Sequence, residues 1–176
     1  MMPEQKKYPT VVLSNAGSWT TPEEGLSDNG SCASKASATI GDYQMQVGTW
    51  GFGIPVDAVI DEVHWSAKFV KNAPYGTVEA RLTIGFSNRS LYAPQVGAAA
   101  CADASWATED NITSMRAWTP ADFNNDLITV AYWLHVLAAS VQRGYVDSCY
   151  VRVVYHVPPP SAPQQSFGDG LVWVTQ

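Results

Sequence analysis

Alternating apolar and polar residues are the dominant pattern along this chain, and a period of two predicts β-strands. Four long stretches share the pattern, each with one apolar face: residues 63–69, 78–86, 128–136 and 149–155. Shorter stretches that repeat it are residues 10–14, 34–40, 43–54 and 114–118. Because turn-forming residues separate these short stretches, the chain is predicted to fold as an all-β, antiparallel β-sandwich of the jelly-roll type.

The spacing of these stretches gives three local predictions. The segment "NAPYG" at 72–76 has turn chemistry, so the strands on either side of it are expected to pair as a hairpin. The inward-facing positions are even up to Ile60 and odd from Val63 onward, and this change of phase predicts a β-bulge near Asp61 and Glu62. A helix is expected only in the alanine-rich residues 98–111.

The chain is predicted to form one domain with an extended arm at each end. Residues 1–13 are the N-terminal arm, residues 14–157 the jelly-roll sandwich, and residues 158–176 a proline-rich linker followed by a C-terminal strand. The prolines at 158–160 favour an extended backbone, so residues 158–170 can span up to about 40 Å.

The C-terminal arm carries an apolar, strand-like hexamer, "LVWVTQ" at 171–176. An isolated apolar strand is unstable and prone to aggregate, so the hexamer is expected to pair with a sheet edge. That edge is either its own or, as the long and stiff linker favours, the edge of a neighbouring copy. The residues expected to form this interface arm are Leu171, Val172, Trp173 and Val174.

Composition and charge narrow the classes of partner. Only 15% of the residues are charged and 46% are hydrophobic, so part of the surface is expected to be covered by protein. The net charge of −6 comes with no basic stripe, which argues against nucleic-acid binding. No apolar run approaches the roughly 18 residues of a membrane span, and no signal-peptide core follows the polar N-terminus. We therefore expect synthesis in a cytoplasm and no contact with membranes or nucleic acid.

The three cysteines have no metal-ligand spacing, and one would remain unpaired even if the other two were bridged. We expect Cys32, Cys101 and Cys149 to be free thiols. No Gly-x-Ser-x-Gly elbow is present, and Cys149 and His156 lie on opposite faces of one strand. The chain is therefore predicted not to be an enzyme and to need no cofactor.

Acidic and amide residues give an alternative, a structural calcium site. Residues 122–126 have Asp, Asn and Asp at alternating positions, and the "SDNGS" turn at 27–31 could meet Asp147 in space. Turns in which these side chains bond local backbone are the favoured interpretation. The calcium candidates are Asp28, Asp122, Asn124, Asp126 and Asp147.

Seven tryptophans are many for a chain of 176 residues. Most are assigned to the core and to subunit interfaces, where aromatic residues are enriched. Trp50, Trp106 and Trp133 are kept as candidates for a binding surface that stacks on sugars.

Four segments resemble, in order, a family of jelly-roll-type domains encoded among the structural genes of tailed bacteriophages and prophages. They are "GSWTTPEEGLSDNGSCAS", "WGFGIPVDAVIDEVHW", "WTPADFNNDLITVAYW" and "YVDSCYVRVVY", and the resemblance spans residues 14–156. The positions that carry it are Trp19, Asp28, Gly30, Phe52, Ile54, Pro55, Trp118, Thr119, Pro120, Asp122, Asn124 and Asp147.

This resemblance implies a virion structural protein, either a capsid decoration protein or a tail- or fibre-associated subunit. Its expected partners are further copies of itself and other virion proteins. Its expected location is the virion, assembled in the host cytoplasm. The alternative that the sequence leaves open is a carbohydrate-binding module that attaches to a glycan on the host cell surface.

Overall fold

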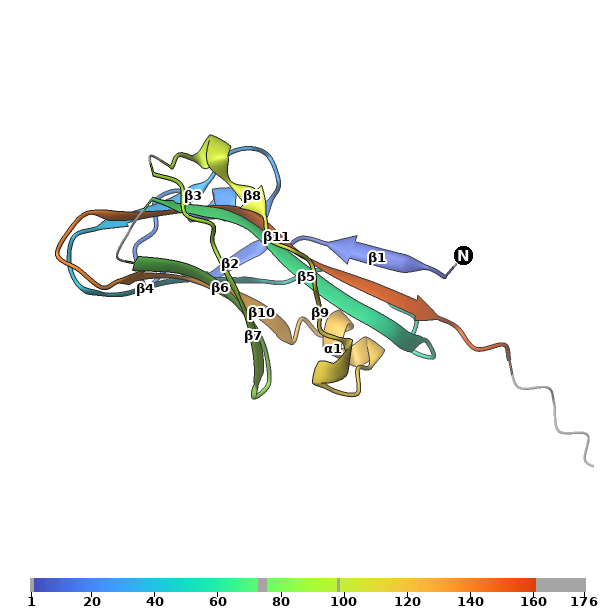
Figure 1. Cartoon of the computed structure of the whole chain (residues 1–176). Helices are drawn as coiled ribbons and strands as arrows, with labels where there is room; N and C mark the ends of the chain where they lie inside the picture. The colour runs from blue at the N-terminus through green and yellow to red at the C-terminus, as the bar shows by residue number, and fades with distance from the viewer. Residues whose placement is uncertain (1, 73–75, 98, 161–176) are drawn as a thin grey trace, which may run out of the picture.

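The computed structural model describes residues 2–72, 76–97 and 99–160, and these form two antiparallel sheets packed as a β-sandwich, as predicted (Figure 1). Sheet A contains β1 (Glu4–Lys7), β3 (Ala33–Ser37), β5 (Val59–Asn72), β8 (Ser105–Trp106), β9 (Asp110–Asn111) and β11 (Gln142–His156). Sheet B has the strand order β2 (Val11–Ser14), β4 (Gly41–Gly48), β10 (Ile128–Val136), β6 (Gly76–Ile84) and β7 (Ser87–Tyr92).

The long pair β11–β5 forms the centre of sheet A, and the other strands of that sheet flank it. On one side β11 also pairs with β1 and β3, and on the other side β5 pairs with β8 and β9. The segment predicted as an N-terminal arm thus contributes β1 to sheet A and β2 to sheet B of its own chain. The C-terminal strand of the predicted arm, residues 171–176, lies outside the described residues.

The core lies between the sheets and is built from the apolar faces that the alternation predicts. Trp65 and Phe69 of β5 face it, as do Tyr132 and its apolar neighbours two residues away on β10. Each such side chain stabilises the fold by about 2–3 kcal/mol when it leaves water. Some of the intervening residues, such as Trp133 on β10, are half-buried on the outer faces.

The predicted bulge is confirmed, and the structure adds a second one. Val154 is opposite Glu62, and the next residue of β11 is opposite Ile60, so Asp61 is the extra residue in β5. In β11, Asp147 is likewise skipped between two consecutive pairs with β5. Each bulge changes which residues of its strand face the core.

The predicted hairpin around residues 72–76 is wrong. β5 belongs to sheet A and β6 to sheet B, so the chain passes from one sheet to the other instead of pairing across the turn. Both strands carry an inward apolar face, and that pattern does not distinguish two paired strands from two facing ones. Phe86, predicted to continue the apolar face of residues 78–86, is fully exposed because Gly85, with φ of +56°, turns the chain after β6.

Helical structure also differs from the predictions. Residues 98–111 contain only the short 3-10 helix η2 (Cys101–Asp103) among those described, and the predicted strand 114–118 begins with another, η3 (Thr113–Met115). A third 3-10 helix is η1 (Pro22–Leu26), and the α-helix of the described residues is α1 (Pro120–Asn124). Alanine content thus predicted the position of the α-helix less well than a sequence motif that begins a helix would have done. A capping box and a proline in the first turn begin α1.

The expectation of three free thiols is wrong. Cys32, just before β3, and Cys101, in η2, form a disulfide across a sequence separation of 69 residues. Cys149 is free and buried in the core. No helix in the described part of the chain is long and apolar enough to cross a membrane.

Candidate functional site

Trp133 lies on the central strand of sheet B, in a row of four outward-facing side chains that crosses four strands. It is opposite Gln44 of β4 on one side and opposite Glu79 of β6 on the other. Glu79 is in turn opposite Tyr92 of β7. Because neighbouring strands are about 4.8 Å apart, about 10 Å separates the backbone positions of Trp133 and Tyr92. We call these four residues the Trp133 row.

The two aromatic residues of the Trp133 row both reach solvent. Trp133 is half-buried, and Tyr92 is 63% exposed. Glu79, between them, is only 4% exposed, so it is covered by its neighbours on the sheet. The row therefore places two accessible aromatic surfaces on either side of a covered carboxylate.

Several hydrogen bonds hold the carboxylate of Glu79. Its Oε1 accepts from Arg81 Nε at 2.8 Å and from Ser90 Oγ, and its Oε2 is 3.2 Å from His135 Nε2. Burial favours the neutral form of Glu79, but the bonds from Arg81, Ser90 and His135 outweigh that effect and lower its pKa. Glu79 is therefore an ionised acceptor at neutral pH.

The same network orients the Trp133 ring. The His135 ring is parallel to it, with 5.9 Å between centroids and 2° between planes. The Arg81 guanidinium carbon is 5.8 Å from the Trp133 centroid, within the range of a cation–π contact. On the far side, His135 Nδ1 is 2.8 Å from Asp42 Oδ1. The outer face of sheet B thus combines aromatic surfaces with fixed hydrogen-bonding groups on rigid strands.

Trp106, the second half-buried candidate, belongs to a different cluster on the outer face of sheet A. Its ring lies 4.9 Å from that of Tyr150, and Tyr8 lies 6.3 Å from Tyr150 on the other side. Lys6 of β1 is placed among the three rings, with Nζ 3.7 Å from the Tyr150 centroid and 5.6 Å from the Trp106 centroid. This aromatic surface is therefore in contact with an ammonium group of the same chain.

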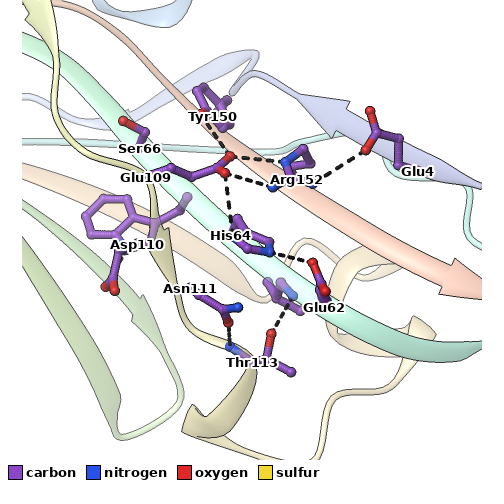
Figure 2. A network of polar contacts seen from close by, with 12 residues as sticks. Glu4, Glu62, His64, Ser66, Glu109, Asp110, Asn111, Thr113, Tyr150 and Arg152 are labelled. Atoms are coloured by element: carbon purple, nitrogen blue, oxygen red, sulfur yellow. Dashed lines mark hydrogen bonds and ion pairs between the residues drawn. The ribbon is translucent and has the colours of Figure 1, made fainter.

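Next to this cluster, a polar network centred on Glu109 joins three segments of sheet A (Figure 2). Arg152 of β11 donates to Glu109 through Nε at 3.1 Å and through Nη2 at 2.7 Å, and Tyr150 donates its hydroxyl at 2.9 Å. His64 of β5 lies 3.5 Å from the same carboxylate, and Arg152 also reaches Glu4 of β1. Figure 2 shows Glu109 pointing from its loop toward these side chains.

The Glu109 network shifts the pKa values of its members. The guanidinium of Arg152 is the main cause of a lowered Glu109 pKa, and the Tyr150 hydroxyl adds to it. Burial, and then the neighbouring Glu109 carboxylate, raise the pKa of Tyr150 to about 12. The groups are thus held as a paired carboxylate, guanidinium and neutral phenol, which is a structural arrangement that ties the segment around Glu109 to β11.

The calcium candidates near α1 bond to protein groups. Asp122 caps α1 by accepting from the Thr119 backbone at 2.8 Å. Asn124 accepts from Ile54 N at 2.9 Å and donates to Ile54 O at 2.7 Å. Asp126 accepts from Trp50 N at 2.7 Å. Only Asp122 bonds local backbone, as the turn interpretation predicts, whereas Asn124 and Asp126 bond backbone groups of a distant segment. Within the described residues, no cluster of three or more acidic, histidine or cysteine side chains could hold a metal.

The other two calcium candidates do meet in space, but around a lysine. Lys68 Nζ is 2.7 Å from Asp28 Oδ1 and 2.7 Å from Asp147 Oδ2. These carboxylates, with Asp147 first, raise the pKa of Lys68. The cation between Asp28 and Asp147 is therefore an ammonium group of the chain.

The structure separates the three tryptophan candidates. Trp50 as a surface residue is a wrong prediction, because it is 2% exposed and its indole N–H donates to Ile128 O at 2.8 Å. Trp106 and Trp133 are half-buried on opposite sheets, and their role in binding stays a prediction. The predicted interface arm, Leu171 to Val174, lies outside the described residues.

Sequence reasoning missed Glu79 and Tyr92. Both lie at the alternate positions of their strands that do not face the core. The alternating pattern predicts only that such positions face solvent. Only the pairing of β6 with β10 and of β7 with β6 aligns them with Trp133. The register between these strands cannot be predicted from a single sequence.

No family model matches the chain, and no curated protein matches it. Among solved structures, the chain is similar to a carbohydrate-binding module determined in complex with β-1,4-galactotriose. The two are 10% identical with a TM-score of 0.41, and the alignment covers 85% of this chain and 87% of that one.

Proposed function

We propose that this protein is a non-catalytic β-sandwich that binds a glycan on the outer face of sheet B. The observation that carries this proposal is the Trp133 row. It places Trp133 and Tyr92 on either side of Glu79, across adjacent strands of one sheet. Sugars present apolar C–H faces and hydroxyl edges, so a site for them needs aromatic surface and fixed polar groups together.

The polar groups of this face suit hydroxyl ligands. Arg81 donates hydrogen bonds and Gln44 both donates and accepts them, while the covered carboxylate of Glu79 holds Arg81 in place. Because Arg81 is already held by Glu79 and lies over the Trp133 ring, a ligand would meet a donor that loses little freedom on binding. The backbone beneath them is a regular β-ladder from β4 to β7, which keeps their spacing constant.

The same groups favour binding over hydrolysis. A glycosidase needs one carboxyl group with a raised pKa as the general acid. The pKa of Glu79 is lowered, so this residue is not poised to donate a proton at neutral pH. Burial raises the pKa of the Cys149 thiol to about 12, so this cysteine is no nucleophile either.

A glycan array probed with the purified full-length chain, followed by titration of the best hit, tests the proposal. Trp133→Ala should weaken binding at least tenfold while leaving the circular dichroism spectrum unchanged. Trp106→Ala is the matched control, since it removes a half-buried tryptophan from the opposite sheet. A blank array, or equal losses from both variants, would rule out this site.

A second candidate function is a structural subunit of a tailed-bacteriophage virion, with other copies and other virion proteins as partners. The supporting observation is that residues carrying the resemblance have framework roles. Trp118 stacks on Phe123 with 5.3 Å between centroids, Asn124 bonds both backbone groups of Ile54, and Asp147 pairs with Lys68. A shared framework is what a family of structural domains would retain.

The two functions are compatible, since a virion protein can bind a host glycan. The virion proposal predicts that an antibody against this chain labels particles released from the producing cells, on the head, tail or fibre. Particles that carry no label, examined beside a positive control for a coat protein, would contradict it.

A further inference from the structure

The edge strand β7 has six residues that pair with β6 in one unbroken register, from Ser87 opposite Ile84 to Tyr92 opposite Glu79. Its other edge has no strand partner among the described residues. Alternation along an antiparallel ladder shows which backbone groups are free. Since Ala93 N bonds Val78 O, the N–H and C=O groups of Asn88, Ser90 and Tyr92 point to the open edge.

The other described edges carry the features that usually prevent strand addition. β1 is four residues long, follows Pro3 and contains three charged residues. β2 has a register shift after Val12. β8 and β9 have two residues each, and β3 is bridged on its outer side by Thr20. β7 is therefore the longest regular edge of the described structure.

A groove of about 500 Å³ runs beside this edge. One wall is formed by residues 88–91 of β7. The other wall is formed by residues 108–110, which lead into β9 of sheet A. Two walls of consecutive residues leave a slot between the open edges of the two sheets. A strand placed in it would extend sheet B and cover the side of the sandwich.

We infer that β7 binds residues 171–176 of a second copy of this chain as an added strand. The segment "LVWVTQ" has the length of β7, carries no charged side chain and alternates as a strand does, so its backbone can pair with the free N–H and C=O groups of β7. Residues 156–160 are exposed and leave the end of β11 away from the sheets (Figure 1). The three prolines at 158–160 keep the backbone after β11 extended. An extended backbone favours pairing of the hexamer with a neighbouring copy over pairing with its own chain.

This inference is independent of glycan binding, and sedimentation velocity tests it. The full chain should self-associate, and deletion of residues 171–176 should weaken association at least tenfold. Asn88→Pro should do the same, because it removes an edge N–H without breaking the ladder to β6. Asn88→Ala is the matched control and should associate like the wild type.

Wild-type association of the deletion or of Asn88→Pro would overturn the inference, as would a full chain that stays monomeric. A synthetic peptide of residues 168–176, added to the deletion variant, should give saturable amide shifts in residues 88–92 and 108–110. Shifts elsewhere, or none, would also overturn it. If Asn88→Pro binds the glycan as tightly as the wild type does, the edge of β7 and the Trp133 row are two different binding sites.

Discussion

Lys68 Nζ lies 2.7 Å from a carboxylate oxygen of Asp147, a residue that is only 1% exposed. The bulge in β11 produces this contact, because Asp147 is the extra residue opposite the junction of Lys68 and Phe69. Lys68 also pairs with Asp28, whose side chain is 38% exposed. One lysine thus links a buried and an exposed carboxylate on the outer side of sheet A.

The first prediction concerns this pair. Lys68→Met should destabilise the fold by about 3–5 kcal/mol, because it leaves the Asp147 carboxylate buried without its counter-charge. Asp28→Asn should cost less than about 1 kcal/mol, since an exposed ion pair contributes little. Urea unfolding at pH 7 measures both values. Equal effects of the two substitutions would show that Asp147 is not the dominant partner.

The second prediction concerns acid stability. Arg152 lowers the pKa of Glu109 below its ordinary value of 4.5, so the folded state holds this carboxylate ionised more strongly than the unfolded state does. The stability that this adds is present above about pH 4.5 and is lost as the pH falls through the folded-state pKa. Glu109→Gln should therefore cost about 1–2 kcal/mol at pH 7 and progressively less below pH 4.5.

Thermal unfolding at several pH values measures that slope, and Glu23→Gln is the control, since Glu23 is an exposed carboxylate. A Glu109→Gln variant whose deficit is the same at pH 3 and pH 7 would contradict the pairing with Arg152.

The strands and most of their inward faces could be predicted from the sequence. A period of two is a local property, and it identified the buried faces of β5, β6 and β10. It even located the bulge at Asp61, because a change of phase must appear in the order of residues. These features depend only on neighbours along the chain.

Features that depend on which strands pair could not be predicted in this way. β5 and β6 face each other from different sheets, although their sequences suit a hairpin equally well. The Trp133 row needs the register of three strand pairs. The disulfide joins two loops that are brought together only by the folded sandwich.

The third prediction tests that disulfide by counting thiols. The native chain should show no reactive thiol, since Cys149 is buried. After unfolding without reductant it should show one thiol, and after reduction three, the full cysteine content. A count of three without reductant would mean that Cys32 and Cys101 are not bonded.

Removing this disulfide should also lower stability. Cys32→Ser together with Cys101→Ser should cost about 2–4 kcal/mol, because the bond closes a long loop of the unfolded chain. Cys149→Ser is unsuitable as a control, since it buries a hydroxyl in the core. The reduced wild type serves instead and should unfold at the same urea concentration as the double variant.

The fourth prediction concerns the contact between α1 and the loop before β5. Asn124 uses its carbonyl oxygen and its amide group to bond both backbone groups of Ile54, as a neighbouring strand would. Asn124→Ala leaves both groups without these partners and should cost about 1–3 kcal/mol. Asn124→Asp keeps the acceptor but places a second oxygen opposite the Ile54 carbonyl, so this variant should be no more stable than Asn124→Ala.

Asn125→Ala is the control, an exposed change in the adjacent position. It should stay within about 0.5 kcal/mol of the wild type in urea unfolding. If both alanine variants unfold alike, the side chain of Asn124 is not what holds α1 to this loop.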